Sequence, residues 1–184
     1  MRRIVSAEYR QMPWRNGGGT TTEIFVAPAE GRFVQRVSIA SIASDGPFSR
    51  YDGYDRHIML LAGEGMTLDC GVHGTIDLRT PLEPRTFSGD WAVHGALVDG
   101  AVRDFNLIVD RALASSSLEV RVLAEPETLA RAPGTTYLVY VIDGALEEAT
   151  AGETLLADDV ALSLRPRGAA RVAIATVTRL PSLP

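Results

Sequence analysis

Lysine is absent from this sequence, and every basic side chain is an arginine. The 18 arginines are spread along the chain without a polybasic cluster, and the net charge is −5. A nucleic-acid-binding surface needs a basic patch, so we expect no nucleic-acid partner. The absence of lysine also excludes the Walker A phosphate-binding loop, which requires a Gly-Lys pair.

Cysteine and histidine are scarce, which argues against most metal sites. Cys70 is the single cysteine, so an internal disulfide and a cysteine-based zinc site are excluded. The three histidines, His57, His73 and His94, are widely separated, and no His-x-His motif occurs. Because zinc, iron and manganese sites usually recruit at least two such ligands, we expect no metal and no other cofactor.

Long apolar segments are missing as well. The longest run, around Ile58–Leu61, is far shorter than the ~18 residues that a transmembrane helix needs. Arg2 and Arg3 stand near the start of the chain, but no apolar segment follows them as in a signal peptide. We expect a cytoplasmic protein without a membrane partner.

The sequence is rich in the pattern of β-strands. Runs of β-branched and aromatic residues are bounded by Gly, Pro or Asp at short spacing, which is typical of a sandwich or barrel. We expect little helix, at most one or two turns near 125–132 after Pro126, and a connector at Ser115–Ser117. The expected strands are Ile4–Arg10, Thr20–Ala27, Val34–Ala43, His57–Ala62, Met66–Cys70, Ala92–Val98, Arg103–Val109, Leu118–Leu123, Tyr137–Asp143, Val160–Leu164 and Arg171–Thr178.

A weak internal repeat divides the chain. Ile58–Gly63 parallels Val139–Gly144 at an offset of 81 residues, and Gly89-Asp90 parallels Asp158-Asp159. Each half then closes on an apolar strand. The repeat predicts two halves with a boundary near 111–118, and we divide the chain into 1–114 and 115–184.

Polar side chains follow one face of several expected strands. Strand side chains alternate with period two, so residues two apart point to the same side. Such a polar face is either solvated, which the pattern alone favours, or lines a pocket. The polar pairs that share a face are Arg36 with Ser38, Asp104 with Asn106, and Thr20 with Thr22.

The most unusual stretch is Trp14–Ile24, in which three consecutive glycines precede a β-branched run. Glycine reaches positive φ and allows a backbone to approach a ligand closely. The spacing fits neither Walker A nor the Gly-x-Gly-x-x-Gly fingerprint of dinucleotide-binding folds. The residues alone leave two interpretations, a plain turn into a strand or a ligand-binding loop.

This stretch, read as Trp14-x-Asn16-Gly-Gly-Gly-Thr20-x-x-Glu23-Ile24, resembles the signature of the HutD/Ves family of bicupin proteins. Further family segments follow in the same order, and the matches cover roughly residues 9–111. They are Arg36–Ala40, Gly46–Ser49, Gly53–Arg56, Leu60-Leu61-x-Gly63-x-Gly65-Met66-x-Leu68, Phe87-x-Gly89-Asp90 and Asp104–Leu107.

The resemblance implies an all-β bicupin, with two cupin-like β-barrel halves in one chain. It implies a metal-free protein of bacterial histidine utilisation that binds an acidic intermediate, such as formylated glutamate or urocanate, and modulates flux. The N-terminal half would carry the ligand pocket. The residues expected at the ligand are Trp14, Asn16, Gly17, Gly18, Gly19, Thr20, Thr22, Glu23, Arg36, Ser38, Ser49, Arg56, Asp104 and Asn106.

Arg36 is the expected main anchor, because a planar guanidinium matches a carboxylate. The glycine amides are expected to add donors. The alternative function is a metal-independent hydrolase or isomerase acting on a small carboxylate substrate, with Glu23 and Asp104 as an acid–base pair. Those carboxylates would otherwise accept hydrogen bonds from Arg36 and Arg56. A scaffold without ligand is the weakest option, and a homodimer through sheet edges is compatible with a cupin.

Overall fold

The computed structural model describes residues 1–181, which fold entirely into strands, turns and loops. No α-helix occurs in this range, and its helical segments are two 3-10 turns, η1 (Ser6–Glu8) and η2 (Gly71–His73). None of the described helices is long and apolar enough to cross a membrane. The all-β prediction is confirmed. The chain divides into two compact units, Arg10–Ala112 and Met1–Tyr9 with the residues from Leu113 onward.

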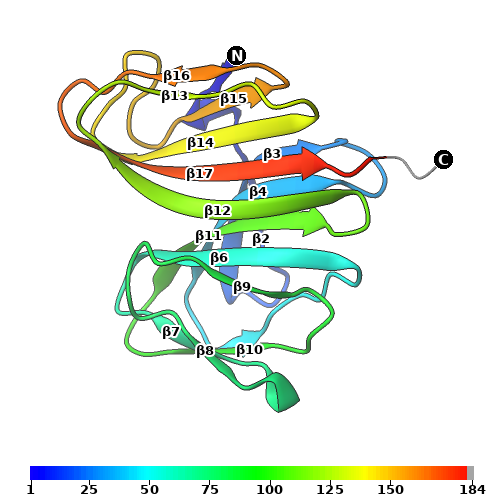
Figure 1. Cartoon of the computed structure of the whole chain (residues 1–184). Helices are drawn as coiled ribbons and strands as arrows, with labels where there is room; N and C mark the ends of the chain where they lie inside the picture. Colours follow the sequence, from blue (N-terminus) through cyan, green and yellow to red (C-terminus); the bar gives the residue numbers. More distant parts are fainter. Residues whose placement is uncertain (182–184) are drawn as a thin grey trace. The chain divides into compact units, whose positions relative to one another are not determined.

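The unit Arg10–Ala112 is built from two antiparallel sheets (Figure 1). The larger has the order β2-β3-β4-β11-β6-β9 and the smaller β5-β10-β7-β8. Both orders are open, so the sheets are not closed into the barrel that was expected. The strands are β2 (Arg10–Pro13), β3 (Gly19–Ala27), β4 (Gln35–Ile42), β5 (Gly46–Pro47), β6 (Tyr54–Ala62), β7 (Met66–Asp69), β8 (Thr75–Asp77), β9 (Arg85–Ser88), β10 (His94–Leu97) and β11 (Val102–Asp110).

The apolar core of this unit draws on both sheets. Ala40, Ile58 and Phe87 come from the larger sheet, and Met66 and Leu68 from the smaller one. The central strands β4, β6 and β11 are buried along most of their length. Any polar side chain on these strands therefore needs a partner inside the protein, because an unpaired buried polar group costs stability.

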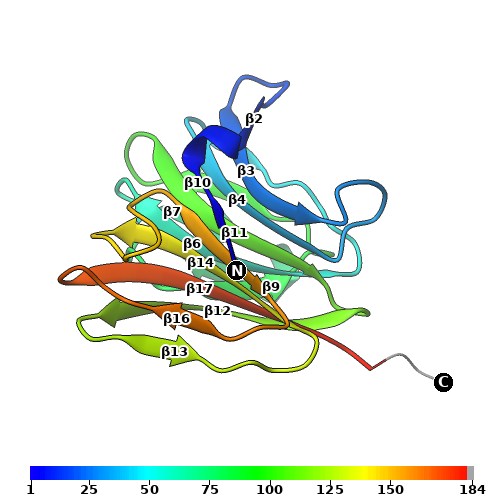
Figure 2. The ribbon, with the colours of Figure 1, turned by 90° about the horizontal axis from the view of Figure 1, so that it is seen from above.

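The other unit contains a five-stranded sheet, β1-β15-β14-β17-β12, and a two-stranded sheet, β13-β16 (Figure 2). The N-terminal segment belongs to it, because β1 pairs with β15 and the Tyr9 hydroxyl donates to the Gly152 carbonyl at 2.9 Å. Its core includes Val139, Leu155 and Val172. The strands are β1 (Arg2–Ile4), β12 (Ala114–Leu123), β13 (Glu127–Leu129), β14 (Thr135–Asp143), β15 (Thr154–Asp158), β16 (Leu162–Leu164) and β17 (Ala170–Arg179).

Three local predictions are wrong. The strand expected over Ile4–Arg10 ends at Ile4, and the 3-10 turn η1 follows it. The helix expected near 125–132 is absent, since β13 forms there and pairs with β16. The side chain of Leu129 is buried in the core while Thr128 is exposed, which is the alternation of a strand. The expected connector Ser115–Ser117 lies inside β12, where it pairs with β17.

The two units share a local irregularity at the positions of the sequence repeat. Leu61 in β6 and Ile142 in β14 are each left out of the pairing register, as in a β-bulge. Two residues later, Gly63 and Gly144 both adopt positive φ, at 99° and 74°. A Cβ atom would lie 2.7 Å from a carbonyl oxygen at Gly63 and 2.4 Å from one at Gly144. Each turn after the bulge therefore requires glycine for two reasons, the positive φ and the close carbonyl oxygen.

We expect Gly144→Ala to lower the free energy of unfolding by about 3 kcal/mol, from backbone strain of about 1 kcal/mol and a steric clash of about 1–3 kcal/mol. Gly168→Ala is the matched control, because Gly168 also has positive φ (+85°) but has nothing within 4 Å of its Cβ position. It should lose only about 1 kcal/mol. Urea unfolding followed by circular dichroism measures both. Equal losses would show that the close approach at Gly144 is unimportant.

Candidate functional site

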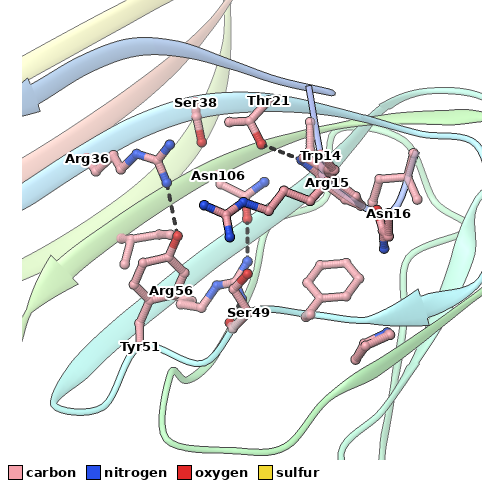
Figure 3. Close-up of a pocket in the computed structure, with 15 residues that line it drawn as sticks. Trp14, Arg15, Asn16, Thr21, Arg36, Ser38, Ser49, Tyr51, Arg56 and Asn106 are labelled. Carbon is pink, nitrogen blue, oxygen red and sulfur yellow. Dashed lines mark hydrogen bonds between the residues drawn. The ribbon is translucent and has the colours of Figure 1, made fainter. Parts of the chain in front are cut away.

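A cavity of about 310 Å³ opens in the unit Arg10–Ala112 (Figure 3). Strands β3, β4, β5, β6 and β11 and two loops, before β3 and after β5, contribute the lining residues. This volume is at the lower end of the range for small-molecule sites. The lining residues are Trp14, Arg15, Asn16, Thr21, Arg36, Ser38, Ala40, Ile42, Pro47, Phe48, Ser49, Tyr51, Arg56, Asn106 and Ile108.

The register of the central strands places one arginine on each side of Ile108. Ile108 of β11 lies opposite Arg36 on β4 and opposite Arg56 on β6. Asn106, two residues earlier on the same face, lies opposite Ser38 on β4. The three strands thus bring both guanidiniums and one amide to the same cavity.

Arg56 is the most deeply buried cation of the cavity, with only 5% of its surface exposed. Its Nη1 donates to the Ser49 carbonyl at 3.1 Å, and its Nη2 donates to Asn106 Oδ1 at 3.0 Å. The guanidinium also lies 5.4 Å from the centre of the Phe48 ring and 5.0 Å from that of Phe87. Such cation–π contacts stabilise a charge without occupying its hydrogen-bond donors.

Asn106 connects Arg56 to Asp104. While its Oδ1 accepts from Arg56, its Nδ2 donates to Asp104 Oδ1. Asp104 is completely buried, and within residues 1–181 neither its Oδ2 nor the Nε of Arg56 has a hydrogen-bond partner. Burial raises the pKa of Asp104 to about 7, although Arg56 and Asn106 act in the opposite direction. Burial also lowers the pKa of Arg56.

Arg36 is held from two sides but keeps free donors. Its Nε donates to Glu23 Oε2 at 2.7 Å, and its Nη1 donates to the Tyr51 hydroxyl at 3.0 Å. A guanidinium has five N–H donors, so three remain for a ligand. Tyr51 is fixed in turn, because its backbone N–H donates to the Gly89 carbonyl at 2.9 Å.

The loop before β3 supplies a third guanidinium. Figure 3 shows the side chain of Arg15 extending from this loop over the cavity. Within residues 1–181, Arg15 forms no hydrogen bond or ion pair, and its side chain is exposed. The loop itself is fixed by Trp14 Nε1, which donates to Thr21 Oγ1 at 2.8 Å.

The glycine amides of this loop are already used within it. The Gly17 N–H donates to the Trp14 carbonyl at 3.0 Å, and the Gly18 N–H donates to Asn16 Oδ1 at 3.0 Å. The role of the glycines is instead steric. A Cβ at Gly19 would lie 2.5 Å from the Ser41 carbonyl oxygen and 3.0 Å from the Trp14 ring.

Half of the residues expected at the ligand line this cavity, namely Trp14, Asn16, Arg36, Ser38, Ser49, Arg56 and Asn106. Of the others, Glu23 is bonded to Arg36 and Asp104 to Asn106. Gly17, Gly18, Gly19, Thr20 and Thr22 are not among the lining residues. Thr21 lines it in place of its neighbours, because Thr21 pairs with Ala40 whereas Thr22 pairs with Ile39 on the opposite face.

Several lining residues were not expected. Arg15 stands at a position of the glycine motif that carries no fixed residue, and Phe48 lies inside the segment Gly46–Ser49. Tyr51 follows in a loop between two recognised segments. In the part of the chain that the structure describes, no three His, Cys, Asp or Glu side chains come close enough to hold a metal ion.

The raised pKa of Asp104 predicts a pH-dependent stability. Between the usual aspartate pKa of about 3.9 and about 7, the folded protein keeps a proton that the unfolded chain releases. The free energy of unfolding of the wild type should therefore fall, relative to Asp104→Asn, as pH rises from 4 to 7, by up to about 4 kcal/mol. Above pH 7 the difference should be constant. Urea titrations from pH 4 to 8.5 measure it, and parallel profiles would contradict the assignment.

Comparison with known proteins identifies relatives of this chain. A protein from Pseudomonas putida described as an uncharacterized 21.2 kDa protein in the hutC 3' region is 45% identical over 107 residues, which span 57% of this chain and 56% of that protein. Protein Ves from Cronobacter sakazakii is 39% identical over 142 residues, 75% of this chain and 76% of that protein.

Solved structures are similar over nearly the whole chain. A conserved protein of unknown function from Pseudomonas aeruginosa PAO1 superposes with a TM-score of 0.85 at 30% identity, covering 96% of this chain and 98% of that one. HutD from Pseudomonas fluorescens SBW25 gives a TM-score of 0.82 at 29% identity, covering 98% and 99%. A cupin 2 conserved barrel domain protein from Leptotrichia buccalis, at 13% identity, a TM-score of 0.58 and coverage of 95% and 100%, shows the fold alone. The HutD family model matches residues 6–180, and the chain therefore belongs to the HutD/Ves family.

Proposed function

We propose that this protein binds a small acidic intermediate of histidine degradation, such as formylated glutamate or urocanate, without consuming it. In this proposal it acts in the cytoplasm and modulates histidine utilisation. The observation that carries the proposal is the set of three guanidiniums, from Arg15, Arg36 and Arg56, around one cavity of about 310 Å³.

The charge of the cavity favours an anion. Its three guanidiniums outnumber the two carboxylates bonded to its lining, Glu23 and Asp104. Arg36 keeps three donors in a planar fork that matches a carboxylate, and Arg15 has no competing partner among residues 1–181. A ligand carboxylate would therefore replace repulsion between like charges with charge-assisted hydrogen bonds.

The apolar residues of the lining suit a carbon skeleton or a flat ring. Ile42, Pro47, Phe48 and Ile108 contribute apolar surface, and the Trp14 indole is held by its bond to Thr21. A small-molecule site typically combines such apolar walls with a few polar groups that fix orientation. Both proposed ligands have this divided character, since each joins a carboxylate to a less polar body.

The family gives the metabolic context. The HutD family is linked to histidine utilisation, and the relative from Pseudomonas putida is described by its place beside hutC. The similar HutD structure from Pseudomonas fluorescens was determined in a formate condition. Formate is the smallest carboxylate, so it is a natural first probe for the arginine side of the cavity.

The enzyme alternative lacks support at the cavity. A hydrolase or isomerase needs a general acid or base within reach of the substrate. Within residues 1–181, none of the side chains that line the cavity is a histidine, cysteine, aspartate or glutamate. Asp104 is hydrogen-bonded to Asn106 and does not line the cavity. His57 is hydrogen-bonded to Thr86, with 2.8 Å between Nδ1 and Oγ1. We therefore favour binding over turnover.

We also infer that the two units are the halves of a bicupin. The support is the bulge at Leu61 and Ile142, which lie 81 residues apart, and the glycine turn that follows each bulge. Two unrelated sheets would have no reason to share an irregularity at equivalent positions.

Arg36→Ala should weaken the binding of formylated glutamate about 10- to 150-fold, because a hydrogen bond to a charged group contributes roughly 1.5–3 kcal/mol. Arg36→Lys should restore only part of the affinity, since an ammonium cannot reproduce the bidentate fork. Isothermal titration calorimetry measures both, with urocanate as a second ligand.

Arg79→Ala is the matched control, because Arg79 carries the same charge in an exposed ion pair with Asp77 and does not line the cavity. It should bind as the wild type does. Unchanged affinity in Arg36→Ala would refute the pocket assignment. Conversion of the ligand to a product by the wild type would support the hydrolase or isomerase alternative instead.

Arg15→Ala should weaken binding less, about two- to fivefold, because Arg15 is exposed and screened by water. The same variant should make the affinity less sensitive to salt, since long-range attraction by an exposed charge is what salt removes. Calorimetry at about 20 and 200 mM sodium chloride gives both values. A loss as large as that of Arg36→Ala would mean that Arg15 becomes buried against the ligand.

A further inference from the structure

Asp104 is placed where no ligand in the cavity can touch it. Its side chain is completely buried and is not part of the cavity lining. Across the sheet it lies opposite Ala40 on β4 and Leu60 on β6, which both belong to the apolar cluster. One of its oxygens has no hydrogen-bond partner. A carboxyl group in this position costs stability, so its presence calls for another reason.

Asn106 is the single side chain between Asp104 and the cavity cation Arg56. Its amide bridges the two groups, with Nδ2 donating to Asp104 and Oδ1 accepting from Arg56. The charge on Asp104 therefore acts on Arg56 through a short, rigid and buried connection. Little water can enter to screen that interaction, so the protonation state of Asp104 is felt at the cavity.

The titratable groups around Asp104 are few. Arg56 on β6 is the cation that acts on it, and Arg36 on β4 and Tyr51 act on Arg56. From the apolar cluster, Cys70 contributes a thiol whose pKa is raised by burial, so the thiol stays neutral. No other charged group is resolved as acting on Asp104 within residues 1–181. A change in the protonation of Asp104 near neutral pH therefore changes the negative charge that acts on Arg56.

We propose that Asp104 is a positioning residue that couples proton binding to anion binding: when its carboxyl gains a proton, Arg56 loses its internal counter-charge and holds a ligand anion more strongly. This inference rests on the proposed anion-binding role of the cavity. A bound anion and the Asp104 carboxylate compete for the same guanidinium. Ligand binding must then take up protons, because the linkage between two sites is reciprocal.

The direction and size of the effect follow from this competition. Burial raises the pKa of Asp104 to about 7, which places its proton exchange in the physiological range. The affinity for an anion should be higher at pH 6 than at pH 8. A buried unit charge acting over one intervening side chain gives an effect on the order of tenfold.

The test uses formylated glutamate as the probe, because its carboxylates stay ionised from pH 6 to 8 whereas the urocanate imidazole titrates near that range. Calorimetry on the full chain should show about five- to tenfold tighter binding at pH 6 than at pH 8. At pH 7, titrations in two buffers of different ionisation enthalpy should show net proton uptake. Asp104→Asn should bind equally well at both pH values and without proton uptake.

Asp77→Asn is the control for the loss of a carboxylate, since Asp77 lies in an exposed ion pair with Arg79 that lowers its pKa. It should keep the pH dependence of the wild type. Equal wild-type affinity at pH 6 and pH 8, or a pH dependence that survives in Asp104→Asn, overturns the coupling while leaving anion binding intact. An absence of binding at both pH values overturns the proposed function and the coupling together.

A direct measurement on the wild type separates these outcomes and does not depend on the folding of any variant. Carbon-13 NMR of the Asp104 carboxyl carbon in the wild type should show half-titration near neutral pH, and added formylated glutamate should move it upward. Ionisation below pH 5, as in an ordinary exposed aspartate, overturns the coupling whatever the cavity binds.

Discussion

The pairing register of β11 between β4 and β6 decides where two of the three guanidiniums of the cavity, those of Arg36 and Arg56, lie. With Ile108 opposite both Arg36 and Arg56, two guanidiniums from different strands meet on one face. A shift of β11 by one residue would turn Asn106 and Ile108 to the opposite face and bring Leu107 toward the cavity. The register is held by buried apolar residues that alternate with the polar set, so the core and the site depend on the same constraint.

Placing polar groups on buried strands costs stability, and the structure shows how that cost is limited. Arg56 satisfies two of its nitrogens with Ser49 and Asn106 and contacts the rings of Phe48 and Phe87. Its Nε and one oxygen of Asp104 have no hydrogen-bond partner within residues 1–181, at a cost of about 1–3 kcal/mol each. Replacing a buried ion pair by apolar residues of similar volume is often neutral or stabilising. Stability alone therefore does not account for these residues.

Part of the central sheet could be predicted from the sequence, because apolar and polar residues alternate over Arg36–Ile39 in β4 and Asp104–Leu107 in β11. The shared face of Arg36 and Ser38, and that of Asp104 and Asn106, followed from that alternation. Short strands such as β13 could not be predicted, since three residues give no periodic signal and Pro126 resembles a helix start. The pattern of β3 was ambiguous because its threonines stand on both faces. Only pairing with β4 shows that Thr21 faces the cavity.

The glycine stretch shows most clearly where reading the sequence alone falls short. Three glycines suggest amide donors for a ligand, yet the amides of Gly17 and Gly18 are bonded within the loop. Gly19 instead allows a close approach of the chain, because a side chain there would clash with the backbone of Ser41 and with the Trp14 ring. The loop can therefore pack closely against the C-terminal end of β4. Trp14 is held there by its hydrogen bond to Thr21, and Arg15 extends over the cavity. In the proposed function, the glycines would act on a ligand indirectly, through the position they give to Trp14 and Arg15. Because Arg15 stands at a position that the motif leaves free, another residue there would change the charge of the cavity without disturbing the loop.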